Sequence, residues 1–130
     1  MRNSARSNMT PAIKHRTIWL ANLNPQKGTE PGKTRPVLIL QDQALLDAGH
    51  PSTIIIPLTT NLIDDAEPLR TRVKAREKLG RDSDLLIDQI RAIDNRRITS
   101  GPIAHLESDL MKRVYQAVLE VIGMNPFAPD

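Results

Sequence analysis

The chain consists mainly of short apolar runs, rich in β-branched residues, that are separated by proline, glycine and polar residues. Such runs are typical of β-strands. We expect strands over residues 17–23, 36–40, 53–58, 69–75, 85–90, 92–93 and 97–102, with one helical turn at 44–46. A single segment has helical spacing, because its apolar residues from Leu106 to Ile122 recur at intervals of three and four, and Gly123 follows as a C-terminal cap.

Many short strands followed by one helix predict a mainly β fold with a C-terminal α-helix. Because the strands cannot cover both faces of a flat open sheet, we expect a curled, partly closed barrel on which the helix packs. A chain of 130 residues suits one domain, which we place at residues 17–124. Residues 1–16 are expected to form a flexible basic tail, and residues 125–130 a C-terminal tail.

The composition excludes several kinds of site. The chain has no cysteine, which excludes disulfides, thiolate metal sites and a cysteine nucleophile. Its three histidines have no paired spacing, so we expect neither a metal nor a cofactor. Aromatic residues make up only 2%, which argues against a platform for base stacking. No apolar run approaches the roughly 20 residues of a membrane span, and residues 1–16 lack the apolar stretch of a secretory signal, so we expect a cytoplasmic protein.

Positive charge is concentrated in two segments. The net charge is +3, but residues 1–16 carry +4 and residues 70–81 carry +5, so the other residues sum to −6. Period-two alternation places Arg70, Arg72 and Lys74 on one face of the strand expected at 69–75. Such clusters indicate a polyanionic partner, although a solvated loop and tail would have the same composition.

A loop that contains Gly28 and Gly32 leads to Arg35 at the start of an apolar strand. Pro36 restricts the residue before it to an extended conformation. The planar guanidinium group of arginine can hold a phosphate through two parallel hydrogen bonds. The alternative is a structural arginine that is bonded to carbonyl groups or to Glu30.

Thr59, Thr60 and Asn61 directly follow the most β-prone run of the chain. Their hydroxyl and amide groups can donate hydrogen bonds to phosphate oxygens. The same residue types also end strands through local bonds to the backbone, which is the alternative here. Further along, acidic residues alternate with apolar ones and are expected to face solvent or to pair with nearby cations, namely Asp82, Asp84 and Asp88.

In this order, the segments resemble the motifs of the MazF/PemK family of toxin endoribonucleases. The resemblance extends from about Thr17 to Gly123. Each motif is weak alone, but together and in this order they are specific. The motifs are Ile18-Trp19-Leu20, Asn24-Pro25, Lys27 to Glu30, Gly32 to Pro36, Pro57 to Thr60 and Leu86 to Asp94.

The resemblance implies an SH3-like barrel of the CcdB/PemK toxin type that works as a homodimer. It implies sequence-selective, metal-independent cleavage of single-stranded RNA through attack of the ribose 2′-hydroxyl. The products would then carry a 2′,3′-cyclic phosphate and a 5′-hydroxyl. It also implies a cognate MazE-like antitoxin, whose flexible acidic tail occupies the RNA groove along the dimer interface.

By the same resemblance, Arg35 and Thr59 are the catalytic residues. Glu30 lies in the neighbouring loop and would assist the proton transfer that the family assigns to the arginine. Asp88 and Gln89 match a pair that contacts RNA in relatives. Further candidates for substrate binding are polar residues within or near these motifs: Thr29, Lys33, Thr34, Thr60, Asn61, Arg72, Lys74 and Arg91.

Two other functions stay open at this point. A gyrase-poisoning toxin of the CcdB type would share the barrel, but that family lacks the Arg35 and Thr59 constellation. A non-catalytic RNA- or DNA-binding module would use only the basic surface. The basic strand at 69–75 departs from common family patterns, and we expect it to follow an RNA backbone or to bind antitoxin carboxylates. Cleavage of single-stranded RNA in the presence of EDTA distinguishes the three functions.

Overall fold

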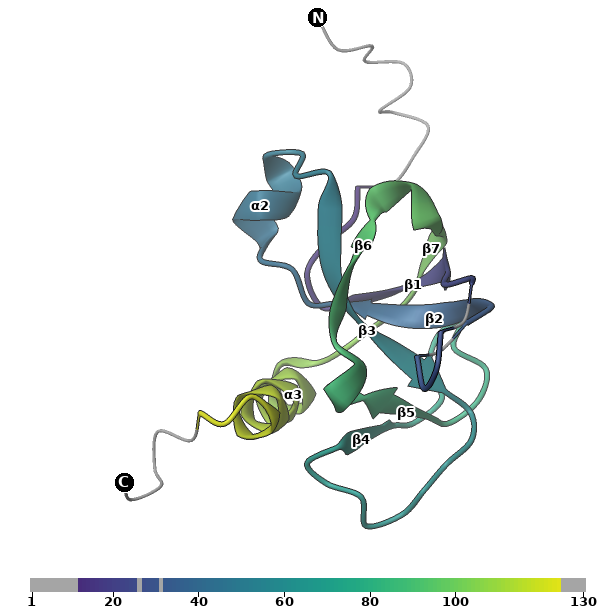
Figure 1. Ribbon diagram of the computed structural model, residues 1–130, viewed down its shortest axis with the longest axis vertical. Helices are drawn as coiled ribbons and strands as arrows, with labels where there is room; N and C mark the ends of the chain where they lie inside the picture. The colour runs from purple at the N-terminus through teal and green to yellow at the C-terminus, as the bar shows by residue number, and fades with distance from the viewer. Residues whose placement is uncertain (1–11, 26, 31, 125–130) are drawn as a thin grey trace, which may run out of the picture.

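The computed structural model describes residues 12–25, 27–30 and 32–124 of the chain. Strands predominate, and the longest helix comes last (Figure 1). In chain order the elements are β1 (Thr17–Asn22), β2 (Thr34–Ile39), α2 (Gln43–Asp47), β3 (Ser52–Thr59), β4 (Arg70–Val73), β5 (Ser83–Leu86), the 3-10 turn η1 (Ile87–Gln89), β6 (Arg91–Asp94), the 3-10 turn η2 (Asn95–Arg97), β7 (Ile98–His105) and α3 (Ser108–Val121).

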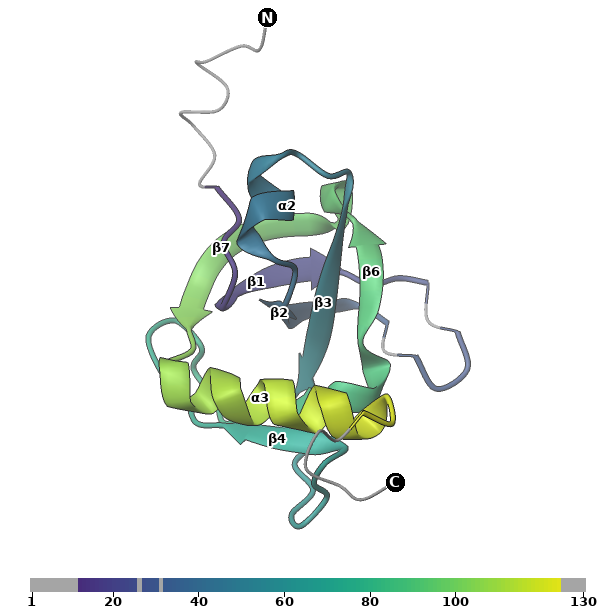
Figure 2. The same cartoon turned by 90° about the vertical axis from the view of Figure 1, so that its left-hand side faces the viewer.

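The strands form one antiparallel sheet in the order β4-β5-β3-β2-β1-β7, and β6 pairs with β3 beside this path. The sheet is strongly curled, with α3 lying next to β4 and α2 at the opposite end (Figure 1 and Figure 2). The outer strands β4 and β7 do not pair with each other, so the sheet is not closed. The predicted mainly β fold with a C-terminal helix is therefore confirmed, in the form of an open barrel.

Strand β3 is the strand on which the others are assembled. One of its edges pairs with β2, while its other edge pairs with β6 over the first half and with β5 over the last two residues. The neighbouring residues Ile55 and Ile56 account for this position, because their β-branched side chains are buried on opposite faces of the pleated strand. The pairing registers of β2, β5 and β6 with β3 therefore fix where these three strands lie.

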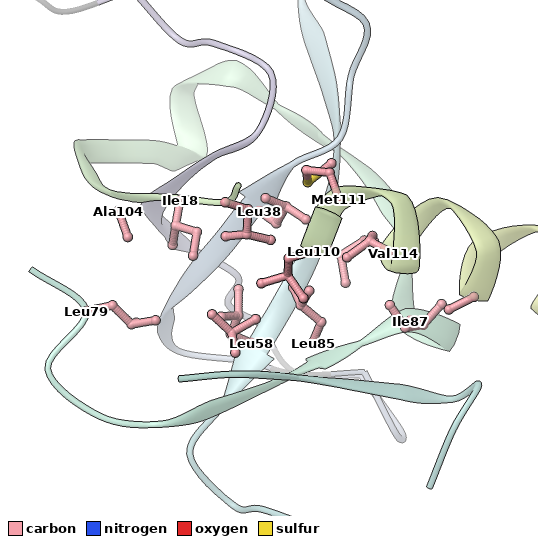
Figure 3. Packing of buried hydrophobic residues seen from close by; sticks show 14 residues of the cluster. Ile18, Leu38, Leu58, Leu79, Leu85, Ile87, Ala104, Leu110, Met111 and Val114 are labelled. Carbon is pink, nitrogen blue, oxygen red and sulfur yellow. The ribbon is translucent and has the colours of Figure 1, made fainter. Parts of the chain in front are cut away.

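The larger hydrophobic cluster fills the space between the sheet and α3 (Figure 3). Leu110, Met111 and Val114 come from α3, and Leu38 is among the residues that come from the sheet. The spacing of three and four in the sequence places these helical residues on one face. Gly123 follows the helix with a left-handed φ of +84°, and its N–H donates to the carbonyl of Glu120 at 3.1 Å, as a C-terminal cap requires.

A second cluster lies on the other face of the sheet. Neighbouring residues of one strand belong to different clusters, because side chains alternate along a strand. Leu38 and Ile56 belong to the larger cluster, whereas Val37 and Ile55 belong to the second, against which Leu46 of α2 packs. Both faces of the central strands are therefore buried, and this defines their register tightly.

The expected strand at 85–90 is shorter in the structure, because β5 ends at Leu86 and η1 follows. The N–H of Ile90 donates to the carbonyl of Ile87 at 3.3 Å, and both side chains join the larger cluster. In a continuous strand these two residues would face opposite sides of the sheet. Burial of both side chains therefore favours a turn over the local β propensity.

Strand β7 continues to His105, past the turn that was expected at Gly101 and Pro102. β7 pairs with β1 at the edge of the sheet, where proline is tolerated because no ladder bond is lost. Gly101 has a φ of +153°, and a Cβ atom at this position would lie 2.6 Å from the Trp19 ring. Only glycine allows the strand to pass this close to the indole.

Part of the segment assigned to the N-terminal tail is bound to the body of the protein. Ile13 packs against the second cluster, and Arg16 donates from Nε and Nη2 to the carbonyl of Leu106 at 3.0 and 2.8 Å. The rest of that tail, residues 1–11, and the C-terminal tail, residues 125–130, lie outside the described residues. None of the helices in the described ranges has the length and apolar character needed to cross a membrane.

Asp84 of β5 is the one charged residue that is fully buried among those the structure describes, with 1% of its surface exposed. Its Oδ1 accepts from Nε of Arg72 at 2.6 Å. Its Oδ2 accepts from Nη1 of Arg70 at 3.2 Å and from the N–H of Ile63 at 3.0 Å. Burial is the largest influence and raises the pKa of this carboxyl group, but the three donors together outweigh it and hold the pKa below its ordinary value. Asp84 therefore joins β4, β5 and the loop after β3 as an anion.

We expect Asp84→Asn to lower the free energy of unfolding by about 3 kcal/mol at neutral pH, since it removes the buried charge that pairs with two partly buried arginines. Folding lowers the pKa of Asp84, so the carboxylate stabilises the protein above the unfolded pKa of about 3.9. This contribution is lost as the pH falls through the lower folded pKa. The stabilities of wild type and variant should therefore converge below about pH 4, which urea denaturation as a function of pH measures.

Asp65→Asn is the matched control, because Asp65 is an exposed carboxylate of the neighbouring loop that forms no ion pair within the described part of the chain. It should change the free energy of unfolding by less than about 0.5 kcal/mol at neutral pH. If the free energies of unfolding of wild type and Asp84→Asn, plotted against pH, stayed parallel down to about pH 2, an ionised Asp84 in the folded state would be contradicted.

Candidate active site

The two predicted catalytic residues stand on neighbouring strands. Arg35 is the second residue of β2, and Thr59 is the last residue of β3. The antiparallel register pairs Val37 with Pro57, and the ladder ends there because Pro36 has no N–H to donate. Extending this register by two residues along both strands sets Arg35 opposite Thr59. Opposed residues of an antiparallel pair project from the same face, so this register directs the guanidinium and the hydroxyl to one side of the sheet.

Arg35 is half-buried, and its backbone also pairs with Ala21 of β1. Its Nε donates to the carbonyl of Gly32 at 3.0 Å. Within the described residues, no further hydrogen bond or ion pair engages the guanidinium group, Glu30 included. The carbonyl bond that the sequence analysis gave as an alternative is therefore present, but it leaves the two Nη groups available to an anion.

The hydroxyl of Thr59 is half-buried and accepts a hydrogen bond from the N–H of Asn61 at 3.1 Å. This is the local strand-ending bond that the sequence allowed as an alternative. A hydroxyl has one proton to donate in addition to its lone pairs. The turn therefore holds the Thr59 oxygen without using the proton that would reach a bound group.

The loop between β1 and β2 projects from the sheet and leads to Arg35 (Figure 2). Thr29, Glu30 and Lys33 are exposed in this loop, and Thr34 is exposed at the start of β2. Lys33 has a left-handed φ of +63°, and its N–H donates to the side-chain oxygen of Asn24 at 2.7 Å. The structure therefore places these four predicted residues on the chain segment that ends at Arg35, with their side chains in solvent.

Three arginines of residues 70–81 are paired with carboxylates from other segments. Arg70 and Arg72 both bind Asp84, and Arg72 also binds the exposed Asp64 at 2.9 Å. The hydrogen bond with Asp84 is the largest influence on Arg72, and together with Asp64 it raises the pKa of the guanidinium further. Lys74 is exposed and forms no ion pair within the described ranges. Arg76 pairs with Glu107, while Glu77, the acid of the segment, pairs with His105.

A polar hollow of about 380 Å³ lies beside β4, and neither Arg35 nor Thr59 lines it. Its wall includes Arg72, Asp84 and Arg113, and Arg113 pairs with Glu67 of the same wall at 3.6 Å. The charges of this hollow therefore largely satisfy one another. In the part of the chain that the structure describes, no three His, Asp or Glu side chains are grouped as metal ligands would be.

Three further predicted residues lie in the 3-10 turn and the strand that follow β5. Asp88 and Gln89 are in η1, and Arg91 is the first residue of β6. Arg91 pairs with Ile55, four residues before Thr59, which separates it from Thr59 by about 13 Å along the strand. Arg91 is therefore not next to Thr59, although it projects from the same face of the sheet.

Sequence reasoning missed the place of Asp84 at this site. The register pairs Asp84 with Thr59 on one side and with Arg72 on the other. A row of polar residues, Arg35, Thr59, Asp84 and Arg72, therefore runs across four adjacent strands. The sequence signal that could have revealed this row is the acidic residue Asp84 among apolar residues of one strand, together with the alternating Arg70 and Arg72 of the preceding strand.

This arrangement can hold an anion with two kinds of donor. The Nη groups of Arg35 supply positive charge, and the hydroxyl of Thr59 supplies a neutral donor from the adjacent strand. Donors that are mounted on paired strands keep their relative positions when a ligand binds. A tetrahedral phosphodiester presents two non-bridging oxygens to such a pair.

Known proteins resemble this chain over most of its length. The family model described as PemK-like, MazF-like toxin of type II toxin-antitoxin system matches residues 14–122. Endoribonuclease EndoA of Bacillus subtilis (strain 168) is 34% identical over 110 residues, which cover 82% of this chain and 90% of the relative. Endoribonuclease MazF of Staphylococcus saprophyticus is 33% identical over 112 residues, which cover 83% of this chain and 89% of the relative.

Solved structures have the same fold. MazF of Deinococcus radiodurans, crystal form I, matches with a TM-score of 0.73 at 23% identity and covers 88% of this chain and 99% of that chain. A MazE-MazF complex from the same organism, form III, matches with a TM-score of 0.69 at 21% identity and covers 88% and 100%. The match of the family model to most of the chain, with two curated relatives above 30% identity, shows that the chain belongs to the PemK-like, MazF-like toxin family of type II toxin–antitoxin systems.

Proposed function

We propose that this chain is an endoribonuclease toxin that cleaves single-stranded RNA at selected sequences, without a metal ion, and is inhibited by a cognate antitoxin. The observation that carries the proposal is the β2–β3 register, whose extension sets Arg35 opposite Thr59 on one face of the sheet. The curated relatives of the chain are named endoribonucleases, which supports RNA as the substrate.

The substrate supplies its own nucleophile in this proposal. The 2′ oxygen of a ribose attacks the adjacent phosphorus, and a 2′ O–P bond forms while the bond from phosphorus to the 5′ oxygen of the next nucleotide breaks. The 2′-hydroxyl gives up its proton, and the leaving 5′ oxygen takes up a proton. The products therefore end in a 2′,3′-cyclic phosphate and a 5′-hydroxyl.

Arg35 and Thr59 act on the phosphate of this reaction. Negative charge grows on the non-bridging oxygens in the transition state, and the free Nη groups of Arg35 bind and neutralise it. Thr59 donates its hydroxyl proton to the same phosphate. Because both donors are in place before the RNA binds, little reorganisation is needed at the moment of reaction.

Proton transfer needs a further group, since the pKa of arginine exceeds about 12 and a free guanidinium is a poor acceptor of protons. We assign this assistance to Glu30, an exposed carboxylate on the loop that leads to Arg35. The other polar residues of the site, which are exposed or half-buried, bind flanking nucleotides in this proposal. They are Thr29, Lys33, Thr34, Thr60 and Asn61 near the catalytic pair, and Arg72, Lys74, Asp88, Gln89 and Arg91 further along the sheet.

The proposed inhibitor is a MazE-like antitoxin with a flexible acidic tail, whose carboxylates take the place of RNA phosphates. A neighbour in fold was solved as a MazE-MazF complex, which supports a partner of this kind. We further propose a homodimer in the cytoplasm. The side of α3 that exposes 40% of Tyr115 and 60% of Ile122 offers apolar surface for contact with a second copy.

We expect Arg35→Ala to lower the rate of RNA cleavage by about 10³-fold while the unfolding temperature changes little, because the guanidinium stabilises charge that develops in the transition state. Arg96→Ala is the control, because Arg96 is 91% exposed and pairs with Asp94 at the other end of β3. Purified proteins are incubated with single-stranded RNA in EDTA, and mass spectrometry of the fragments identifies the expected 2′,3′-cyclic phosphate.

Several outcomes would contradict this proposal. Full activity of Arg35→Ala, a requirement for a divalent cation, or fragments that end in a 3′-hydroxyl would each overturn the mechanism. RNA that stays intact in the presence of the wild type, over many sequences, would favour one of the two rival functions. Inhibition of DNA gyrase by the purified protein would then identify the CcdB-like toxin, and RNA or DNA binding alone would identify the non-catalytic module.

We expect Lys74→Ala to weaken RNA binding and to reduce its salt dependence. Lys74 tests the basic strand better than Arg72 does, since Arg72 is already held by Asp64 and Asp84. Loss of one phosphate contact should reduce the slope of log affinity against log salt by about 0.7. Fluorescence anisotropy with a non-cleavable 2′-deoxy oligonucleotide measures the slope, and Lys112→Ala, an exposed lysine of α3, is the control. An unchanged slope would exclude Lys74, which directly follows β4, from the RNA-binding surface.

A further inference from the structure

We propose that Asp84 and Arg70 are positioning residues for RNA cleavage, because they hold the turn after β3 so that the hydroxyl of Thr59 presents its proton to the phosphate. This inference rests on the proposed role of Thr59 and extends it to two residues that need not touch the RNA. The sequence placed Arg70 only in the basic row of its strand, and Asp84 only among acids that face solvent or pair with cations.

Arg70 and Asn61 form the first link of this network. Nη1 of Arg70 donates to the carbonyl of Asn61 at 2.8 Å and to Oδ2 of Asp84 at 3.2 Å. The N–H of the same Asn61 donates to Oγ1 of Thr59 at 3.1 Å. Both backbone groups of Asn61 are therefore bonded, one to the guanidinium and the other to the hydroxyl oxygen of Thr59.

Asp84 holds the same turn at a second point. Its Oδ2 accepts from the N–H of Ile63 at 3.0 Å, two residues after Asn61. Asp84 is also the register partner of Thr59 on β5. The turn is therefore attached to the β4–β5 hairpin through Arg70 at Asn61 and through the carboxylate at Ile63. The two bonds to Asp84 are partly shielded from water, since 1% of the Asp84 side chain and 18% of the Arg70 side chain are exposed, whereas the bond from Arg70 to the Asn61 carbonyl lies at the exposed surface of the turn.

The network has a chemical consequence for Thr59. The N–H of Asn61 occupies one lone pair of the hydroxyl oxygen, so the hydroxyl proton cannot point toward Asn61. The hydroxyl can therefore donate its proton in fewer directions before RNA binds. When one of these directions faces the reacting phosphate, such orientation raises the reaction rate by a large factor. If the turn were free, the hydroxyl would rotate and the donor would be aligned for a smaller fraction of the time.

Stability alone is a weak explanation for this buried carboxylate. Removing a charge from water is costly, and apolar residues of similar volume often replace a buried ion pair with no loss of stability. Asp84 stands beside Thr59 in the register, whereas Asp94 forms a more exposed carboxylate–arginine cluster at the other end of β3. Asp94 accepts from the N–H and the guanidinium of Arg96 and pairs with Ser52, so it serves as a matched reference.

The test is a double-mutant cycle on the rate of RNA cleavage. Arg70→Met keeps the apolar stem but removes the donors, and we expect kcat to fall by between about 10-fold and 100-fold with little change in KM. Arg70→Lys should restore part of the loss, because an ammonium group can donate to the Asn61 carbonyl. In the Thr59→Val background, Arg70→Met should cause no further loss of kcat, since no hydroxyl remains to be positioned. Asp94→Asn should leave kcat unchanged.

Each outcome decides between the alternatives. An equal loss of kcat from Arg70→Met with and without the Thr59 hydroxyl, or no loss in either background, would overturn the positioning role while leaving the proposed function intact. Wild-type kcat in Thr59→Val would instead contradict the proposed function at Thr59, and this inference with it. Hydrogen exchange at the Asn61 amide is a readout independent of activity. It should be faster in Arg70→Met than in wild type or Asp94→Asn, and an unchanged exchange rate would also overturn the proposal.

Discussion

Strand β3 pairs with β2 along one edge and with β6 and β5 along the other, and these registers decide where the candidate functional groups lie. A shift of one residue between β2 and β3 would turn the guanidinium of Arg35 to the other face of the sheet. Burial prevents such a shift, because alternate residues such as Leu38 and Val37 fill separate clusters on the two faces. Both hydrophobic clusters therefore help to fix the positions of Arg35 and Thr59, because they fix the register of β2 and β3.

The folded chain also redistributes the charge of the sequence. Residues 70–81 carry +5, but Asp64, Asp84 and Glu107 from other segments pair with three of their arginines. Cations that form no ion pair within the described residues include Arg35, Lys33 and Lys74. Some of the positive charge that is free to bind an anion therefore lies around the start of β2 and directly after β4, and the charge is not spread evenly along the basic strand.

Much of the fold follows from local patterns, and the parts that do not follow depend on contacts between distant residues. The β-branched run in β3 and the spacing of three and four in α3 predicted those elements, and the order of motifs around Arg35 and Thr59 indicated the family that the comparisons show. The end of β5 at Leu86 was not predictable, because it depends on burial of Ile87 against α3 and the sheet. The burial of Asp84 was hidden for the same reason, since its partners Arg70 and Arg72 lie on another strand.

The central claim is that Arg35 and Thr59 bind the same phosphodiester of RNA. The most direct test is a crystal structure of the protein with a 2′-O-methyl oligonucleotide that spans its mapped cleavage site and cannot be cut. The account predicts that an Nη group of Arg35 and the hydroxyl of Thr59 both lie about 2.7–3.1 Å from oxygens of the phosphate at that site. A scissile phosphate bound elsewhere on the molecule, or one that contacts neither side chain, would contradict it.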